Sequence, residues 1–464
     1  MNYWLLRSKW GTDDRTRQFI RNDEWKNEQD GKYTDIVNRI EEGDVLFLSD
    51  NSLFHYYGVC VANEQDGRHI TVDNWKKFPQ PIVFPAKAAY LKRIVKINDN
   101  KLIEKVILGI EKLKEEESIC IKSINLKNFT LFEREYLLFS SGVNVLIGEN
   151  GTSKTQLMKL MYSILKSNNE LTQEHSIANL RSLFRISIEK NIKSILKPEH
   201  IDNLIYKNEI NSEIHFDLKQ YSIKFYFTKD DEEIINLESD YSREGKRFFS
   251  KKSIFFPAKE ILSFYTGFRS IYNQTSFDAT FDDLANHLGR LVPKNRVLEN
   301  FEEKILKDLE EILGGKIILE QDRFYLLEED GNKREITLVA EGARKLGTIF
   351  HLLANGTIEK GSVVFWDEPE SNLNPKFIRY MAKMLLKLEK AGIQIFIATH
   401  SLFLVREIEI LREEENSIKY FGFGFDEDNK LRVSDGDRLT DLEDVVFLDE
   451  SLSQSNRYLT KRNG

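Results

Sequence analysis

The stretch that decides the fold reads Gly148-Glu149-Asn150-Gly151-Thr152-Ser153-Lys154-Thr155. It follows the apolar run 143–147 and precedes a helical pattern over 156–161. Strand, glycine-rich loop and helix in this order are the setting of a phosphate-binding loop. Glycines let the backbone fold closely around a phosphate with N–H groups pointing inward, and the positive end of the helix adds to the attraction. The sequence therefore predicts that these eight residues bind a nucleotide.

The last residues of the loop carry its chemistry. Lys154 is expected to reach the β- and γ-phosphates, and the Thr155 hydroxyl is expected to ligate Mg²⁺. Ser153 stands where the usual pattern, G-x-x-x-x-G-K-[ST], has a glycine. Serine is small enough for that position if its φ angle is negative. The alternative interpretation is a glycine turn before an ordinary helix.

Composition sets the outer limits. The chain has 464 residues, enough for two or three domains, and its formal net charge of −8 means that any contact with nucleic acid needs a local basic patch. Two cysteines, Cys60 and Cys120, cannot form a disulfide framework, and no Cys/His cluster has zinc spacing. The sequence shows no apolar run of 18 residues and no signal-peptide pattern, so we expect a cytoplasmic protein without membrane contact.

Residues 1–97 are typical of a small β-rich domain. The segments 1–6, 40–46 and 58–59, with Trp25, resemble EVE domains of the PUA-like superfamily. The resemblance implies a small β-barrel-like domain with an aromatic-lined pocket that receives a flipped, often modified, base. The candidate rings are Tyr3, Trp4, Trp25, Tyr56, Tyr57 and Trp75. The alternative is that most of these rings belong to the core.

The rest of the chain divides at changes of pattern. Residues 98–118 have apolar side chains at helical spacing and predict an amphipathic connecting helix. Residues 119–450 form the nucleotide-binding domain, in which about 168–252 is interpreted as an inserted lobe outside the nucleotide site. This lobe contains a predicted hairpin over 213–227. We expect the polar tail, 451–464, to be flexible.

A second motif supplies carboxylates. Four apolar residues, 363–366, run into Asp367 and Glu368, as in a central parallel strand whose carboxyl end faces a ligand. Asp367 is expected to hold Mg²⁺, and Glu368 to polarise the attacking water as a general base. The alternative is a buried strand that runs into an acidic turn. A further apolar strand, 394–399, ends at His400.

Together with the loop 371–374, these motifs resemble the ABC-class ATPases, in the branch of SMC, RecF-like and OLD-type proteins. The resemblance covers about 119–425 and implies an α/β ATPase head with a mixed sheet and a helical lobe. It makes His400 the switch histidine of the catalytic site and places Asn374 at the nucleotide. Residues 338–346 stand in place of the LSGGQ signature, with Ala340 for its serine. Gly342 and Arg344 or Lys345 are then expected to meet the γ-phosphate of the opposite subunit.

The match is nearest to compact bacterial ATPases called AAA-15 or AAA-21, many of which act in anti-phage defence beside a nuclease or toxin. This resemblance implies an ATPase that binds ATP and Mg²⁺, dimerises through ATP and switches a separate effector, with the N-terminal domain as sensor or docking module. One alternative is a DNA-repair or DNA-processing ATPase of the RecF or SMC type. Another is a scaffold that binds nucleotide without hydrolysing it and assembles around a toxin or nuclease.

Basic side chains on the surface favour the DNA-processing alternative if they gather on one face. The candidate patches are Lys190, Lys193 and Lys197, and Arg243, Lys246, Arg247, Lys251 and Lys252. The usual alternative is that such charges are simply solvated.

Overall fold

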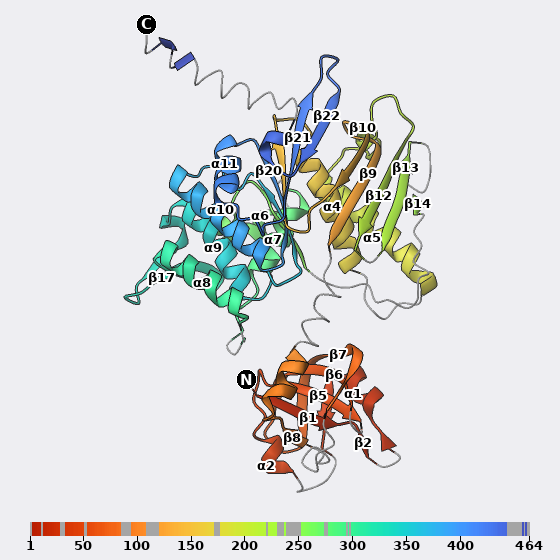
Figure 1. The fold of residues 1–464 in the computed structure, drawn as a ribbon, viewed down its shortest axis with the longest axis vertical. Coiled ribbons are helices and arrows are strands. Elements are labelled where there is room, and N and C mark those ends of the chain that lie inside the picture. The colour runs from red at the N-terminus through yellow and green to blue at the C-terminus, as the bar shows by residue number, and fades with distance from the viewer. Residues whose placement is uncertain are drawn as a thin grey trace. The chain divides into compact units, whose positions relative to one another are not determined.

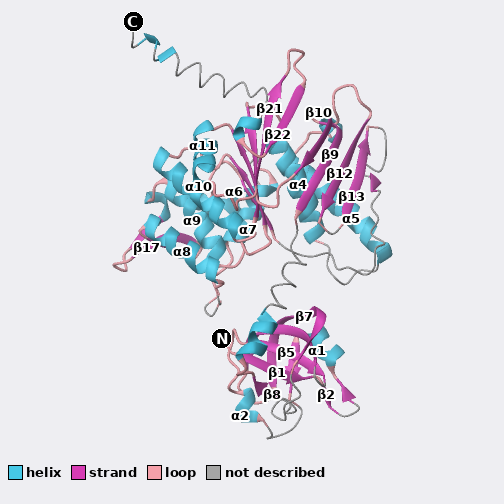
Figure 2. Cartoon of the chain, viewed as in Figure 1, coloured by secondary structure: helices cyan, strands magenta, loops and turns pink. Residues whose placement is uncertain are grey.

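The computed structural model is shown in Figure 1, and Figure 2 separates its helices from its strands. The structure describes residues 2–10, 13–27, 33–50, 53–84, 94–107, 120–170, 177–219, 221–229, 236–237, 252–272, 277–293, 296, 298–442, 457–458 and 460–461. The chain divides into two compact units, one of residues 1–117 with 293–299 and one of residues 118–292 with 300–464.

The first unit is built on a six-stranded sheet in the order β4-β7-β6-β5-β1-β8. Its strands are β1 (Tyr3–Arg7), β4 (Glu24–Lys26), β5 (Val45–Asp50), β6 (Leu53–Asn63), β7 (His69–Val83) and β8 (Ile94–Lys96). The β1–β5 pair is parallel and the other pairs are antiparallel. A two-stranded ribbon, β2 (Lys9–Trp10) with β3 (Asp13–Asp14), and the helices α1 (Thr16–Asn22) and α2 (Thr34–Val37) complete the unit.

Successive residues of this sheet are buried on opposite faces. Trp4 and Leu6 enter one apolar cluster, whereas Leu5 between them enters another. Side chains alternate across a strand, so β1 is covered on both sides. Leu102 and Val106, from the helical residues 100–107, belong to the second cluster. The remainder of the predicted connecting helix, 108–118, lies outside the described residues.

Three of the four tryptophans in residues 1–117 belong to the core of this unit. Trp4, Trp25 and Trp75 are each at most 3% exposed, and each indole N–H has a partner. They donate to a carboxylate oxygen of Asp44 at 2.8 Å, to the Arg7 carbonyl at 3.1 Å and to the Glu24 carbonyl at 3.3 Å. The prediction that tryptophans line a cleft is therefore wrong for all three. The physical reason is that an indole N–H with a hydrogen-bond partner can be buried without loss, so the whole ring can enter the core.

The second unit centres on a six-stranded sheet in the order β15-β19-β20-β11-β21-β22. These strands are β11 (Val143–Gly148), β15 (Ser253–Phe256), β19 (Val363–Asp367), β20 (Gln394–Thr399), β21 (Ile418–Phe425) and β22 (Leu431–Gly436). Only the β21–β22 pair is antiparallel. The carboxyl ends of β11, β19 and β20 consequently meet at one edge of the sheet. This mixed α/β architecture, beside a small N-terminal β unit, confirms the predicted fold class.

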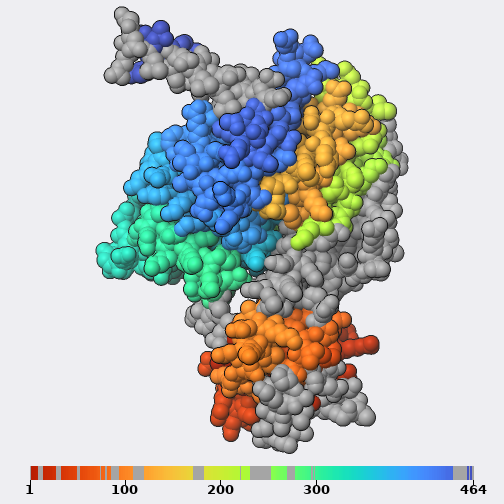
Figure 3. All heavy atoms as spheres, in the orientation of Figure 1, coloured from red at the N-terminus to blue at the C-terminus, as the bar shows by residue number. Residues whose placement is uncertain are grey.

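A second sheet has the order β10-β9-β12-β13-β14. Its strands are β9 (Ile121–Phe129), β10 (Phe132–Leu138), β12 (Asn211–Leu218), β13 (Ser222–Thr228) and β14 (Asn236–Leu237). The predicted hairpin of β12 and β13 is present, and it pairs with β9. The hairpin therefore extends a sheet that begins before the phosphate-binding loop. Figure 3 shows β9 and the hairpin as adjoining orange and yellow-green surfaces.

Helices fill the space around both sheets. Figure 1 shows α4 beside one side of the central sheet and α10 beside the other. The apolar cluster around α4 joins side chains of both sheets. The remaining elements are α4 (Lys154–Asn169), α5 (Ile177–Leu196), η2 (Ile201–Leu204), η3 (Leu262–Phe264), α6 (Tyr265–Tyr272), α7 (Ala279–Leu288), α8 (Asn300–Leu313), β16 (Gly315–Glu320), β17 (Arg323–Glu328), β18 (Lys333–Glu335), η4 (Ile336–Leu338), α9 (Glu341–Ala354), α10 (Pro375–Lys390), α11 (Leu402–Leu411) and η5 (Leu439–Asp441).

Candidate nucleotide-binding site

The glycine-rich loop connects β11 to α4, and two of its glycines have a clear physical reason. A Cβ atom on Gly148 would lie 2.1 Å from the backbone oxygen of Phe423 on the neighbouring strand. Gly151 has a φ of +83°, in the left-handed region that favours glycine. Ser153 also has a positive φ, +65°, so the negative φ under which serine was expected to fit this position is not met. The loop keeps its glycine-like path here with a side chain that is disfavoured in this conformation.

Lys154 is folded into the loop. Its amine is within hydrogen-bonding distance of the Gly148 and Glu149 carbonyls, at 2.9 and 2.6 Å, and of the Thr152 hydroxyl at 3.0 Å. The residue is only 9% exposed. Burial lowers the pKa of Lys154 to about 8, and the nearby carboxylates Asp367 and Glu368 oppose this shift. Carbonyl oxygens of the loop surround the Lys154 amine, and rotation of the side chain would bring this amine to an anion bound in the loop.

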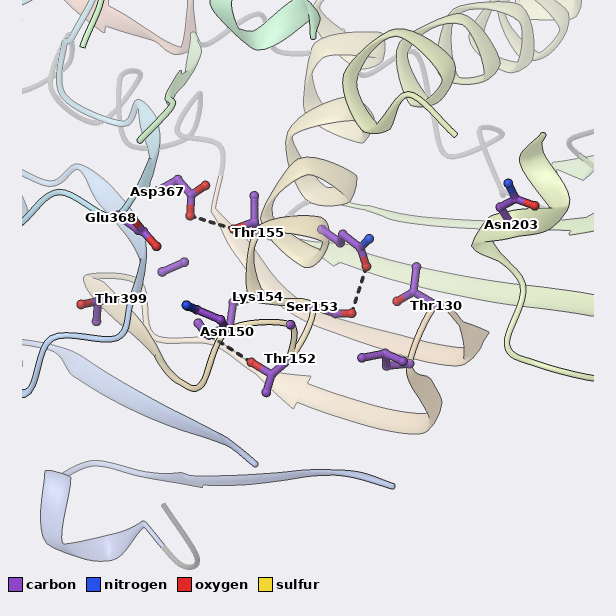
Figure 4. Close-up of a pocket in the computed structure, with 14 residues that line it drawn as sticks. Thr130, Asn150, Thr152, Ser153, Lys154, Thr155, Asn203, Asp367, Glu368 and Thr399 are labelled. Carbon is purple, nitrogen blue, oxygen red and sulfur yellow. Dashed lines mark hydrogen bonds between the residues drawn. The ribbon is translucent and has the colours of Figure 1, made fainter. Parts of the chain in front are cut away.

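Thr155 and Asp367 bring the two halves of the site together. The Thr155 hydroxyl donates to Oδ1 of Asp367 at 2.8 Å, as Figure 4 shows. Burial raises the pKa of the Asp367 carboxyl to about 6; the hydrogen bond from Thr155 lowers it and the charge of Glu368 raises it further. A hydroxyl and a carboxylate are hard oxygen ligands, which Mg²⁺ prefers. The donor set at this point therefore fits the predicted metal.

Glu368 and His400 form the second pair at the sheet edge. Nδ1 of His400 lies 3.2 Å from Oε1 of Glu368, and their side chains are 49% and 34% exposed. The backbone of Glu368 has a φ of +47°, although this residue is not a glycine. Its N–H donates to the Ala398 carbonyl at 2.9 Å. Strained backbone at a non-glycine residue is common where a side chain must be aimed at a ligand.

A cavity of about 500 Å³ lies over the loop. Of the predicted site residues, its lining includes Asn150, Gly151, Thr152, Ser153, Lys154, Thr155, Asp367 and Glu368. Gly148 and Glu149 contribute through the carbonyls that hold Lys154, and His400 through its contact with Glu368.

Several lining residues were missed from the sequence. They are Thr130, Leu131, Gln156, Asn203, Ala398 and Thr399. Figure 4 shows Thr130 and Asn203 across the pocket from Asp367 and Glu368. The interpretation of 168–252 as lying wholly outside the site is therefore wrong at Asn203. This residue belongs to η2, which is held to the end of β9 by the bond from the Thr130 N–H to the Leu204 carbonyl and by the bridge of Phe129 with Ile205; no motif marks it.

The signature segment and Asn374 lie elsewhere in this chain. Gly342 is the second residue of α9, where a Cβ atom would lie 2.8 Å from the ring of Phe377. Asn374 is the N-cap of α10, since its side chain accepts from the Phe377 N–H at 3.1 Å. Neither residue lines the cavity. Their predicted contact with nucleotide thus depends on a second subunit.

Two basic residues of the signature helix are occupied within the chain. Nε of Arg344 lies 2.8 Å from Oε1 of Glu260, and this pair is 15% and 6% exposed. Lys345 is 3% exposed, and its amine donates to the carbonyl and hydroxyl of Ser371 at 2.8 and 2.7 Å. Nη1 of Arg344 also donates to the Val339 carbonyl, so two of its three nitrogens have partners within the chain. Lys345 instead fastens α9 to the loop after Glu368.

The predicted basic patches are only partly described. Lys193 pairs with Glu189 on α5, and Lys197 donates to the Phe277 carbonyl. Lys252 donates to the Gly356 carbonyl at 2.7 Å. Arg243, Lys246, Arg247 and Lys251 lie outside the described residues. The amines of Lys197 and Lys252 therefore serve the fold of this unit.

Among the described residues, no three or more His, Cys, Asp or Glu side chains gather as a metal would require. A magnesium ion that is held by one carboxylate, one hydroxyl and phosphate oxygens needs no such cluster. Among the same residues, no helix has the length and apolar character needed to span a membrane. Both cysteines are free thiols.

Solved structures of several ATPase heads are similar to this chain. The Smc head domain of Pyrococcus furiosus, bound to the C-terminal domain of ScpA, has 12% identity and a TM-score of 0.41 and covers 75% of this chain and 100% of its own. The SMC head domain of Thermotoga maritima has 13% identity and a TM-score of 0.40, covering 68% and 98%. The recombination mediator RecF has 12% identity and a TM-score of 0.32, covering 66% and 96%. No curated protein matches the sequence.

A family model gives the more direct assignment. The model described as "AAA domain, putative AbiEii toxin, Type IV TA system" matches residues 143–406. This range is more than half of the chain and runs from the start of β11 into α11. It contains the phosphate-binding loop, the Asp367–Glu368 pair and His400. The AAA-21 part of the predicted resemblance is confirmed: the chain belongs to the AAA_21 family.

Proposed function

We propose that this protein is an ABC-class ATPase whose ATP-driven dimerisation switches a separate effector, a nuclease or a toxin, in defence against phage. The observation that carries the ATPase proposal is the meeting of Thr155 with Asp367, at 2.8 Å, beside Lys154 and Glu368. Phosphate-binding groups and a metal-binding carboxylate belong to one cavity. A glycine turn before an ordinary helix does not require that arrangement.

Each side chain has a task in hydrolysis. Backbone N–H groups of the loop and the amine of Lys154 bind the phosphates. Thr155 and Asp367 hold Mg²⁺, which when bound neutralises charge that develops on the transferred phosphoryl group. Glu368 accepts the proton of the attacking water, and His400 orients Glu368 through the 3.2 Å contact. The positive φ of Glu368 aims its carboxylate over the strand end.

The signature segment supports a dimer. Leu338, its first residue, is 73% exposed, and Gly342 and Asn374 do not line the cavity of their own chain. A second copy that presents these residues to the nucleotide would complete the site. ATP then lies between two chains, and its hydrolysis releases them. The effector reads the closed or the open state.

The N-terminal unit is proposed as the module that senses a ligand or docks the effector. The three tryptophans of the predicted set belong to the core, which leaves Tyr3 and Tyr56 as the partly exposed rings of that set. Base stacking on aromatic faces thus has fewer rings available. This favours docking over recognition of a flipped base.

The proposal is tested with the full chain and its Glu368→Gln variant. The parent is expected to hydrolyse ATP in the presence of Mg²⁺. The variant is expected to bind ATP but to turn it over more slowly by a factor of ~10²–10⁴, the weight of a positioned general base. Sedimentation in ATP should show a persistent dimer of the variant. A parent that binds ATP without hydrolysing it would favour the nucleotide-gated scaffold instead.

The DNA-processing alternative has a separate test. A steep fall in DNA affinity between 50 and 200 mM salt is expected if the protein neutralises several phosphates. The internal bonds of Lys197 and Lys252 give this alternative no added support.

A further inference from the structure

A third carboxyl group follows Asp367 and Glu368 in the sequence and is more deeply buried than either of them. Glu370 is 6% exposed, and its Oε1 accepts a hydrogen bond from the Thr399 hydroxyl at 2.6 Å. Its other oxygen, Oε2, is buried without a hydrogen-bond partner among the described residues. Glu370 does not line the nucleotide cavity. A carboxyl group in such a place is costly to keep and needs an explanation.

The partner of Glu370 stands at the other catalytic segment. Thr399 is the last residue of β20 and immediately precedes His400. Its hydroxyl also accepts from the Ser401 N–H at 2.9 Å, so it braces the backbone on the far side of His400. The Glu370–Thr399 bond therefore joins the loop that carries Glu368 to the loop that carries His400.

Two bonds thus flank the catalytic contact. One is the backbone bond from the Glu368 N–H to the Ala398 carbonyl, at 2.9 Å, and the other is the Glu370–Thr399 bond. Between them lies the 3.2 Å contact of Glu368 with His400. The strained φ of Glu368 needs surrounding structure that determines it. Without Glu370, one of the bonds that join the Glu368 loop to the His400 loop is lost.

The chemistry of the site fits an uncharged side chain. Burial raises the pKa of Glu370, and the charge of nearby Glu368 adds to the shift. The bond to Thr399 needs only an acceptor oxygen, which a neutral acid or an amide provides as well as a carboxylate. Glutamine therefore has the required shape and acceptor, whereas leucine has the shape alone.

We propose that Glu370 is a positioning residue that, through Thr399, holds Glu368 and His400 in the geometry for water activation. This inference rests on the proposed ATPase function and deepens it. Glu370 touches neither nucleotide nor water; it acts on the reaction only through the segment that carries His400. Loss of the bond should therefore change the rate of hydrolysis and leave nucleotide binding intact.

The test compares three variants of the full chain in steady-state ATP hydrolysis. Glu370→Leu is expected to lower kcat by ~10–10²-fold, the effect of a small misplacement of a catalytic group, without changing KM. Thr399→Val removes the same bond from the other side, together with the bond from the Ser401 N–H, at a residue that lines the cavity. Adding Glu370→Leu to Thr399→Val is therefore expected to lower kcat no further. Glu370→Gln should stay close to the parent. A kcat for Glu370→Leu equal to that of the parent would overturn the proposal.

A second background separates positioning from a general loss of structure. In Glu368→Gln the base is absent, so adding Glu370→Leu should leave the residual rate unchanged; a further fall would overturn the proposal. If Glu370→Leu fails to fold, Thr399→Val decides alone, and parental kcat there overturns it. When Glu368→Gln abolishes hydrolysis but Glu370→Leu does not lower it, only this inference fails. A parent that binds ATP and hydrolyses none overturns the proposed function and this inference together.

Discussion

The hydroxyl of Thr155 and the carboxylate of Asp367 are 2.8 Å apart, although 212 positions separate them in the sequence. The strand order explains this meeting, because β11 and β19 are both neighbours of β20 and run parallel to it. Parallel strands present their carboxyl ends at one edge, where ligands of open α/β sheets bind. The relationship supports the nucleotide assignment more directly than either motif does alone.

Replacement of Lys154 by alanine is expected to abolish ATP binding. The amine is the cation of the loop, and its loss removes a charge-assisted bond to the phosphates. The variant should stay folded, since burial already disfavours the charged amine. Titration calorimetry with ATP is the measurement. The matched control is Lys159→Ala, one turn along α4, where the lysine pairs with Asp278 and not with the loop. Unchanged ATP affinity in Lys154→Ala would contradict the assignment.

The Mg²⁺ dependence of ATP binding should distinguish the role of Asp367 from that of the phosphate-binding loop. We expect the parent to bind ATP less tightly in EDTA than in Mg²⁺, because Thr155 and Asp367 ligate the ion together with phosphate oxygens. Asp367→Asn should bind ATP with an affinity that hardly responds to Mg²⁺. The measurement is titration calorimetry of the parent and of Asp367→Asn with ATP, each in Mg²⁺ and in EDTA. A full response to Mg²⁺ in Asp367→Asn would remove this residue from the metal site.

The phosphate-binding loop and its flanking strands can be predicted from the sequence because each depends on neighbouring residues. The loop, the paired carboxylates and the strands β11, β19 and β20 are local patterns, and the residues 143–148 and 363–367 form strands as predicted. Thr130 lies in the turn between β9 and β10, and the bond from its N–H to the Leu204 carbonyl places the distant Asn203 at the cavity, which no spacing reveals. Register and tertiary pairing decide such contacts.

The prediction that Trp4, Trp25 and Trp75 line a cleft was wrong for a different reason. Composition tells how many polar-tipped rings a domain has, but it does not tell whether each tip has a partner. Asp44 is buried and accepts from the Trp4 indole, from the Asn2 N–H and from the Glu41 N–H. That network makes a buried tryptophan favourable, and it depends on Asp44, which is 40 positions from Trp4. Similarly, the positive φ of Ser153 is a property of the folded loop.

Replacement of Ser153 by glycine is expected to preserve ATP affinity and to raise the free energy of unfolding slightly, by up to about 1 kcal/mol. A left-handed non-glycine residue costs about 1–2 kcal/mol, and the greater freedom of glycine in the unfolded chain cancels part of the gain. Ser153→Val should lose both stability and ATP affinity, because a β-branched residue tolerates this φ least. Urea unfolding and ATP titration of the two variants provide the measurement. Equal stability of the valine and glycine variants would show that the backbone here relaxes to a negative φ.

We expect the free energy of unfolding to depend on pH through the buried side chain of His287. It lies in the last turn of α7, and its Nδ1 is buried without a hydrogen-bond partner among the described residues. Burial lowers the pKa of His287 to about 4, and the charges of Arg290 and Lys252 add to the shift. The unfolded chain, with a pKa near 6.5, binds the proton at a higher pH than the folded chain does. Stability is therefore retained above pH 6.5 and lost as the pH falls toward 4, by up to about 3 kcal/mol.

The matching experiment is urea unfolding of the parent and of His287→Gln between pH 7.5 and pH 4. Glutamine keeps a polar side chain and cannot take up the proton, so the variant should lose less stability on acidification than the parent. Carboxylates contribute equally to both proteins, and the difference between the two curves isolates His287. His200→Gln, at an exposed histidine before η2, is the control and should follow the parent. If the curves of the parent and of His287→Gln stay parallel down to pH 4, the folded protein takes up a proton at His287 as easily as the unfolded chain does, and burial does not exclude the charge there.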